Sequence, residues 1–221
     1  RGFDGRATLN SSIREHLASE ALNGLGIPTT RSLAVIGIRE LIYRQRPELA
    51  AILVRVADSH IRFGSFEFFH YNGQGKNVER LLEFSIQSYY PDIVEESDKY
   101  RIFFQRTVKR TAKLIAKWQA VGFIHGVMNT DNMCITGTTF DYGPYGFMDR
   151  FAPKYTSNHS DTHGRYAYSQ QPEIGFWNLN KLAETLTPLI GAEILEEEMK
   201  QYQPTFNRLY REEMSKKLGL A

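Results

Sequence analysis

The stretch HGVMNTDNMCITGTTFDYGPYGFMD, residues 125–149, gathers the side chains whose types and spacing best suit chemistry. Asn132 and Asp141 would offer an amide oxygen and a carboxylate, and Mg²⁺ takes such hard oxygen ligands alongside water and phosphate oxygens. The segment between them, MCITGTTF (133–140), has the pattern of a short hairpin that would bring the two side chains together. The stretch therefore predicts a site for a metal ion and a nucleotide.

A second carboxylate stands next to one of these ligands. Asp131 precedes Asn132, and on an extended backbone neighbouring side chains point to opposite sides, so Asp131 would stay unliganded and act as a base. Gly143 and Gly146 would let the backbone approach a bound phosphate. A plainer interpretation exists, because Asn and Asp are common turn residues and 130–132 could form an Asx turn. The residues alone leave both interpretations open.

Three further residues have a structural or an undecided interpretation. No second His or Cys stands at metal-ligand spacing from His125, so we expect a hydrogen-bonded structural histidine. Cys134 lies in an apolar run and is expected to be buried. Arg55 interrupts the apolar run AILVRVA, so its side chain lies either on an exposed face or in a cleft.

Regular elements must hold these residues in place. TLNSSIREHLASEALNGLG (8–26) predicts a helix whose start Ser11 or Ser12 caps. RSLAVIGI (31–38) and AAILVRVA (50–57) predict strands, and the polar residues between them predict a turn or loose hairpin.

The rest of the chain is predicted to be mostly helical. DKYRIFFQRTVKRTAKLIAKWQAVG (98–122) is the clearest helix, because Val108, Ala112 and Ile115 share one face, Lys and Arg fill the other, and Gly122 ends the pattern. We also expect short strands at MCIT and TTFDY, an irregular polar segment at 151–173, and helices at 77–90, near 177–188 and at 192–216. This order of elements indicates an α+β fold.

Bulk composition narrows the classes of function. The 221 residues are 42% apolar and 24% charged, an ordinary globular balance for one domain or somewhat more. The net charge of +2 gives no argument for a nucleic-acid or anionic-membrane partner. One cysteine excludes an intrachain disulfide, and no apolar run reaches the ~18 residues that a bilayer span needs.

The motif order resembles a protein-kinase C-lobe. The kinase catalytic loop H-R-D-L-x-x-x-N is followed by D-F-G. Here HGVMNTDN places Val127 where that family has its catalytic Asp, and DYG (141–143) takes the place of D-F-G. The resemblance implies a kinase-like chain without the usual kinase base.

A closer resemblance is to the selenoprotein O family, also called the YdiU family. It is carried by HGVMNTDNM and DYGPYGFMD, by FDGRATLNSSIREHLASEAL near the start, and by VRVADSHIRFGSFEFF in the middle. It covers most of residues 1–180. It implies a kinase-like fold that binds ATP in an inverted orientation and transfers AMP, not phosphate, to hydroxyl side chains of proteins.

Matching motifs position by position gives the site that this resemblance implies. Asn132 and Asp141 match the family's metal ligands, for Mg²⁺ or Mn²⁺. Asp131 matches the residue proposed as proton acceptor. Arg55 and Arg62 match arginines that hold the phosphates of the nucleotide.

The remaining matches lie near the start of the chain. Asp4 and Gly5 match nucleotide-contacting positions, and Glu15 matches the helix glutamate that pairs with a nucleotide-binding lysine. That lysine and a Gly-rich segment stand upstream of FDGR in the family, and a Cys- or selenocysteine-containing tail stands downstream. We therefore expect a chain truncated at both ends, which leaves open whether this piece is active alone.

The resemblance also implies a division of the chain and a function. Residues 1–75 would form a partial N-lobe, with helix C, strands and the start of the nucleotide cleft, and residues 76–221 a helical C-lobe with the catalytic loop and the DYG metal site. The implied function is Mg²⁺-dependent transfer of AMP from ATP to Ser, Thr or Tyr hydroxyls of proteins, in the bacterial cytoplasm, or in mitochondria if the chain is eukaryotic. Alternatives are a kinase-type phosphotransferase and a non-catalytic nucleotide-binding pseudokinase scaffold.

Overall fold

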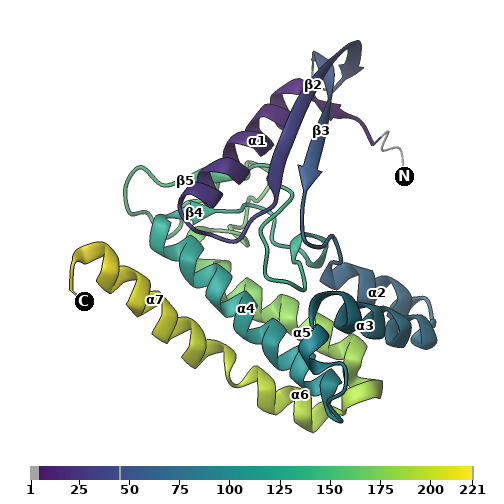
Figure 1. Cartoon of the computed structure of the whole chain (residues 1–221). Coiled ribbons are helices and arrows are strands. Elements are labelled where there is room, and N and C mark those ends of the chain that lie inside the picture. The colour runs from purple at the N-terminus through teal and green to yellow at the C-terminus, as the bar shows by residue number, and fades with distance from the viewer. Residues whose placement is uncertain (1–4, 45, 221) are drawn as a thin grey trace.

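The structure, a computed structural model, describes residues 5–44 and 46–220. A small antiparallel sheet with one helix lies at one end, and a larger group of helices makes up the rest (Figure 1). The predicted α+β class is confirmed. Asp4 lies outside the described residues, so its predicted contact with the nucleotide has no counterpart here.

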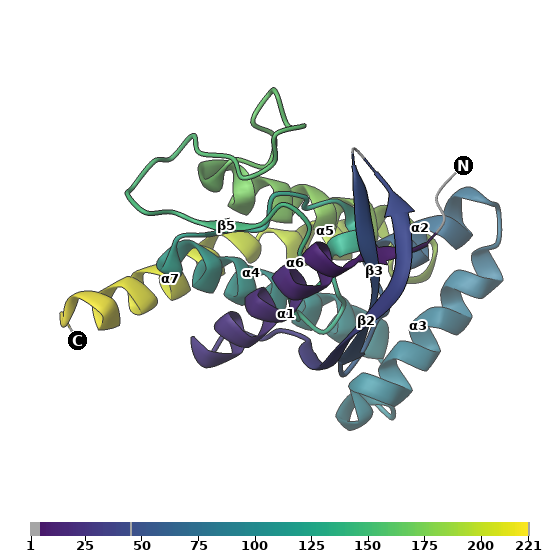
Figure 2. The ribbon, with the colours of Figure 1, turned by 90° about the horizontal axis from the view of Figure 1, so that it is seen from above.

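The sheet and its helix form one wall of the molecule. The strand order is β1 (Ala7–Thr8), β3 (Pro47–Val56) and β2 (Arg31–Tyr43), with antiparallel neighbours. Helix α1 (Leu9–Gly24) packs against β2 and β3 and lies beside the sheet in both views (Figures 1 and 2). The predicted helix 8–26 is thereby confirmed within two residues at each end.

The start of α1 corrects the predicted cap. The Thr8 hydroxyl accepts a hydrogen bond from the Ser11 backbone N–H over 3.2 Å, so Thr8 is the capping residue and neither Ser11 nor Ser12 is. Thr8 also pairs with β3, so the end of a strand and the cap of a helix fall on one residue. Thr8, Ser11 and Ser12 all offer a hydroxyl near the start of the helix, and the sequence pattern alone cannot tell which of them caps it.

The segment between the two strands, predicted as a turn or loose hairpin, belongs to a longer paired hairpin. Cross-strand pairing continues out to Tyr43 opposite Pro47, with a register shift between Ile38 and Leu41. The backbone groups make the cross-strand hydrogen bonds, so polar side chains do not interrupt a ladder whose outer faces meet water. The hairpin is therefore longer than the apolar pattern indicated.

Helix α4 (Lys99–Val121) is the centre of the helical region, and its bounds match the predicted 98–122. Helices α5, α6 and α7 pack against it. Phe103, Phe104 and Trp118 of α4 are buried, and Gly122 takes the left-handed conformation (φ +70°) that ends the helix. The surrounding helices are α3 (Gly75–Tyr89), α5 (Gln171–Ile190), α6 (Ala192–Met199) and α7 (Tyr202–Leu218).

Two helical predictions need correction. The predicted helix 192–216 is two helices, with Pro204 in the first turn of the second, where its missing N–H costs no hydrogen bond. Helix α2 (Phe63–Tyr71) was not foreseen, because its sequence FGSFEFFHY is dominated by phenylalanines, which favour strands. Phe63 and Phe66 anchor it in the core.

The predicted strands MCIT and TTFDY do not pair with each other. Instead β4 (Phe123–Ile124) pairs with β5 (Gly146–Phe147), and the residues between them form a long loop. Isolated bridges tie this loop to Thr29 through Thr139, and to Arg62 through Cys134. The loop is thereby fixed between the segment after α1 and the start of α2.

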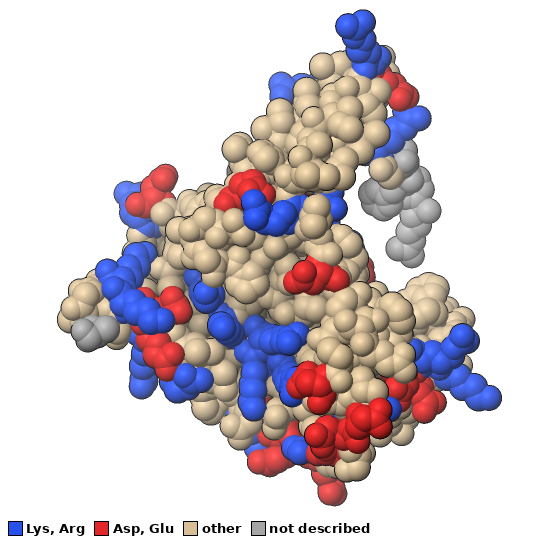
Figure 3. All heavy atoms as spheres, viewed as in Figure 1, with Lys and Arg blue, Asp and Glu red and all other residues tan. Residues whose placement is uncertain are grey.

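The surface in Figure 3 carries both signs of charge. Basic side chains form a band over the helical region, and acidic side chains gather along its lower edge (Figure 3). None of the helices in the described part of the chain combines the length and the apolar character that crossing a membrane requires.

Candidate active site

A cleft of about 840 Å³ lies between the sheet, α1 and the residues around Asp141. Its apolar wall includes the small residues Ala50 and Ala51 of β3, whose side chains leave room in front of the sheet. Its polar wall includes Glu15 of α1 and Arg55 of β3. A flat apolar surface beside charged groups suits a ligand with an apolar ring and an ionic part.

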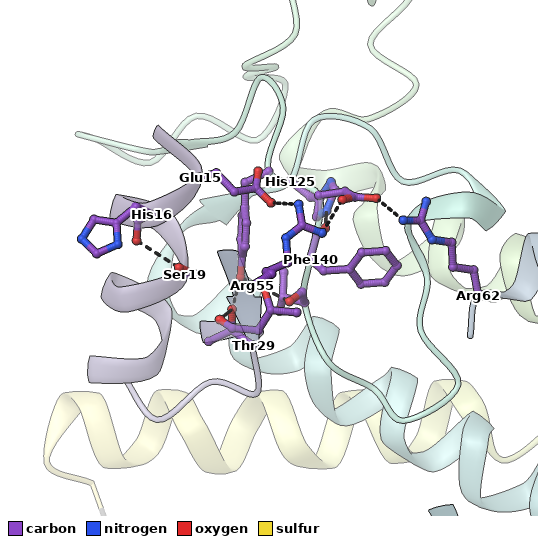
Figure 4. A network of polar contacts seen from close by, with 12 residues as sticks. Glu15, His16, Ser19, Thr29, Arg55, Arg62, His125 and Phe140 are labelled. Carbon is purple, nitrogen blue, oxygen red and sulfur yellow. Dashed lines mark hydrogen bonds and ion pairs between the residues drawn. The ribbon is translucent and has the colours of Figure 1, made fainter. Parts of the chain in front are cut away.

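Ion pairs at the inner end of this cleft link α1, β3, the loop at Asp141 and the residue before α2 (Figure 4). Arg55 Nη2 lies 2.5 Å from Glu15 Oε1, and Arg55 Nη1 lies 2.7 Å from Asp141 Oδ1. Arg62 Nη2 lies 2.9 Å from Asp141 Oδ2. The four side chains form a chain of alternating charge, in which each carboxylate oxygen of Asp141 is held by a different arginine.

The Glu15 carboxylate is the most enclosed member of this network. Only 8% of the residue is exposed, and burial raises the pKa of its carboxyl while the positive charge of Arg55 opposes the shift. The negative charge of Asp141 raises this pKa further. Glu15 therefore depends on Arg55 to stay ionised.

His60 also lines the cleft, although its sequence context suggested no chemistry. Partial burial lowers the pKa of its imidazole, and the positive charges of Arg55 and Arg62 lower it further. The ring is therefore neutral at pH 7, and can both donate and accept a hydrogen bond there.

The backbone at Asp141 is unusual. Asp141 has φ +57°, the only positive φ of a residue other than glycine in the described ranges. The preceding residue is fixed, because His125 Nε2 lies 3.0 Å from the Phe140 carbonyl oxygen (Figure 4). An Asp is among the few residues that adopt this left-handed conformation readily. The local fold thus turns the Asp141 carboxylate toward the two arginines.

His125 has the structural role predicted for it. It is fully buried, its ring packs against Trp118 and Tyr142, and burial lowers the pKa of its imidazole. Because a carbonyl oxygen faces Nε2, that nitrogen carries the proton and donates. His125 is thus a neutral support for the loop that carries Asp141.

Asp131 and Asn132 lie on a short 3₁₀ turn, Thr130–Asn132, so the extended backbone assumed for them is wrong. Asn132 Nδ2 donates to the Val127 carbonyl oxygen over 2.7 Å, which fixes the amide and leaves its Oδ1 available as a ligand. Asp131 is exposed and lies against the first turn of α2, not in the wall of the cleft.

The residues present suit a hard divalent cation. Asn132 would offer an amide oxygen and Asp141 a carboxylate, and the predicted metal role of both stays a prediction. No group of three or more His, Cys, Asp or Glu side chains in residues 5–44 and 46–220 could hold a metal ion. The remaining ligands would therefore have to come from water and phosphate oxygens, as is usual for Mg²⁺.

The predicted nucleotide-binding residues are largely drawn together. Gly5, Glu15 and Arg55 line the cleft beside Asp141, the predicted metal ligand, and Arg62 joins them through its ion pair with Asp141. Of the two positions that the sequence left open for Arg55, the structure shows the cleft and not a freely exposed face.

Ser12 is a cleft residue that sequence reasoning mistook for a helix cap. Only 2% of it is exposed, it lines the cleft, and its hydroxyl has no hydrogen-bond partner within the part of the chain that the structure describes. Ser12 and Glu15 stand three residues apart, which places them on one face of the helix. This three-residue spacing from Glu15 is the sequence feature that could have placed Ser12 in the cleft.

Fold and site together define an α+β protein whose cleft, between a small antiparallel sheet and a helical region, is lined by paired acidic and basic groups suited to a phosphate-bearing ligand. The sequence profile of the family described as "Protein adenylyltransferase SelO" matches residues 1–221. The chain belongs to this family.

Curated relatives called "Protein nucleotidyltransferase YdiU" are similar along the whole chain. The protein from Myxococcus xanthus is 52% identical over 220 residues, which cover 100% of this chain and 45% of that protein. The protein from Klebsiella pneumoniae is 52% identical over 217 residues, covering 98% and 45%. The protein from Thiobacillus denitrificans is 52% identical over 221 residues, covering 100% and 45%. The chain thus spans less than half the length of these relatives.

Proposed function

We propose that this chain carries the nucleotide cleft and the catalytic loop of a protein adenylyltransferase that transfers AMP from ATP to Ser, Thr or Tyr hydroxyls of proteins. The observation that carries the proposal is the ionic network that joins Glu15, Arg55, Asp141 and Arg62 at the inner end of the cleft. Membership of the SelO family supports the same reaction. In this proposal residues 1–75 are a partial N-lobe and 76–221 a helical C-lobe of a kinase-like fold.

Nucleotide binding would use the two arginines. Forked guanidinium groups bind phosphate oxygens through charge-assisted hydrogen bonds, and both arginines already bind a carboxylate here. Glu15 would hold Arg55 in place, while Gly5 lines the cleft and Asp4 precedes it. A bound Mg²⁺ or Mn²⁺, held by Asn132 and Asp141, would neutralise charge that develops on the phosphate oxygens.

The proposed reaction is an in-line displacement at the α-phosphorus of ATP. The substrate hydroxyl oxygen forms a bond to that phosphorus, the bond to the bridging oxygen of the β-phosphate breaks, and pyrophosphate leaves. Asp131 accepts the hydroxyl proton, directly or through a water, a contribution typically of about 10²–10⁴-fold. Its exposure suits a base that must meet a side chain of another protein.

A non-catalytic nucleotide-binding scaffold is the second candidate. The observation that favours it is that both carboxylate oxygens of Asp141 are paired with arginines. A protein that binds no metal could keep its aspartate paired in the same way. A phosphotransferase has less support, because the apolar Val127 stands where the kinase catalytic Asp would be.

The deciding experiment compares ATP labelled at the α-phosphate with ATP labelled at the γ-phosphate. We expect the full-length protein to transfer label to proteins from the α-labelled nucleotide alone. Asn132→Ala and Asp141→Ala should each abolish transfer, and Asp131→Ala should lower it about 10²–10⁴-fold and leave a measurable remainder. Asp149→Ala, which removes an exposed carboxylate from the same stretch, should leave transfer unchanged. Transfer of γ-label would establish the phosphotransferase, and ATP binding without any transfer would establish the scaffold.

The bacterial cytoplasm stays our prediction for the compartment.

A further inference from the structure

Gly64 occupies the second position of α2, where the backbone gives no reason for a glycine. Its φ is not positive, so any residue could adopt the conformation. Within helices glycine is the least favourable residue apart from proline. The reason for a glycine must therefore lie in the space beside it.

That space is filled by Asp131. A Cβ atom added to Gly64 would lie 2.1 Å from Asp131 Oδ1 and 3.1 Å from Asp131 Cγ, far inside contact distance. Gly75, at the start of the neighbouring helix α3, shows the contrast, because a Cβ there would meet no described atom within 4 Å.

The two segments cannot easily move apart to make room. The Phe63 N–H donates to the Met133 carbonyl oxygen over 2.9 Å, which fixes the first turn of α2 two residues from Asp131. Arg62 reinforces the junction through its bridge to Cys134 and its ion pair with Asp141. An added methyl group would therefore displace the mobile partner, the Asp131 side chain.

We propose that Gly64 is a positioning residue for Asp131: it leaves open the space in which the carboxylate rests against the first turn of α2 and, in the proposed reaction, faces an incoming hydroxyl. The N-terminal end of a helix favours a negative charge, so this resting place also suits an ionised carboxylate. The inference rests on the proposed function, because it assigns Gly64 a role through the proposed base.

The test is Gly64→Ala in the full-length protein, with Gly75→Ala as the matched control. Because rotation of one short side chain relieves the clash, the fold and ATP binding should survive while the base is misplaced. We expect kcat for AMP transfer to fall about 100-fold, the effect of a misplacement near 1 Å, with little change in KM for ATP. Gly75→Ala should behave as the wild type.

A double-mutant cycle separates a positioning role from a general structural one. In an Asp131→Ala background the clash is absent, so adding Gly64→Ala should lower transfer no further. Wild-type transfer by Gly64→Ala, or a further loss in the double variant beyond Asp131→Ala, would overturn the inference.

Thermal unfolding of the same four proteins gives a readout that does not depend on activity. We compare the change in melting temperature that Gly64→Ala causes in two backgrounds. This change should be more favourable in the Asp131→Ala protein than in the wild type, because the carboxylate that clashes with the new methyl group is absent. Equal shifts in both backgrounds would overturn the inference. If the wild type transfers no AMP at all, the proposed function fails. The melting temperatures of the four proteins still test whether Gly64 and the Asp131 carboxylate are in contact.

Discussion

Arg55 Nη1 lies 2.7 Å from Asp141 Oδ1, so a residue expected to hold phosphate is bound to a residue expected to hold the metal. Arg62 occupies the other oxygen of Asp141. Phosphates of a nucleotide would compete for both arginines and so release the carboxylate. Nucleotide and metal should therefore bind with positive coupling, and such coupling is reciprocal.

This relationship predicts that Arg62→Ala increases the affinity for Mn²⁺ when no nucleotide is present. Removing one arginine frees one Asp141 oxygen, and we expect a gain of about 5-fold or more, the lower end of typical couplings. Titration of Mn²⁺ followed by electron paramagnetic resonance measures it. Arg106→Ala, which breaks an ion pair with Asp92 away from the cleft, should change nothing. An unchanged affinity in Arg62→Ala would mean that the arginine does not mask the ligand.

The backbone at Asp141 gives a second prediction. Asp141→Gly and Asp141→Ala remove the same carboxylate, but only alanine resists the left-handed conformation at φ +57°. We expect the glycine variant to be more stable by about 1 kcal/mol, which corresponds to about 2–4 °C in melting temperature. The same pair of changes at Asp149, where φ is not positive, should show no such advantage for glycine. Equal stability of the two Asp141 variants would indicate that the turn relaxes.

Local patterns predicted those elements whose signal lies within a single segment. The helix around Val108 and Ile115 followed from its 3.6-residue apolar repeat, and its end followed from Gly122. The loop that carries Asp141 could not be predicted in this way, because its bridges reach Thr29 and Arg62, far away in the sequence. Backbone pairing with distant segments produces no periodic pattern in the local sequence. The prediction of a hairpin over residues 133–140 is therefore wrong.

Those residues of the site that lie within recognisable sequence motifs could be predicted. Resemblance pointed to Arg55, Glu15 and Asp141, and the structure brings these three into contact. Ser12 was missed because hydroxyls near a helix start suggest a cap before they suggest a cleft. Gly64 was missed because its role depends on a carboxylate that approaches from another segment.

His125 gives a third prediction. His125→Leu keeps much of the buried volume but leaves the Phe140 carbonyl oxygen without its donor, a loss of about 1–3 kcal/mol for a buried polar group. We expect a lower free energy of unfolding in urea, with AMP transfer reduced because Asp141 follows Phe140 directly. His159→Leu, at an exposed position, serves as the control and should leave both measurements near the wild type. A fully stable His125→Leu variant would contradict the support role.

The contact between Glu20 and Arg31 predicts how stability depends on pH. Arg31 Nη2 and Nε donate to the two Glu20 carboxylate oxygens over 2.7 and 2.9 Å, which ties α1 to the first residue of β2. Hydrogen bonds from Arg31, followed by one from the Ser32 N–H, lower the pKa of Glu20 to about 2 from 4.5. A depressed carboxyl pKa stabilises the fold above pH 4.5, and this contribution is lost as the pH falls toward 2.

Glu20→Gln should therefore lower the melting temperature near neutral pH, and the gap to the wild type should close as the pH falls from 4.5 toward 2. The effect should be small and should shrink in high salt, because the pair is solvent-exposed. Melting curves at several pH values measure it. Glu95→Gln, at an exposed carboxylate with no ion pair among the described residues, should give a gap that does not change over this range. A constant gap for Glu20→Gln would show that the carboxylate acts through packing and not through its charge.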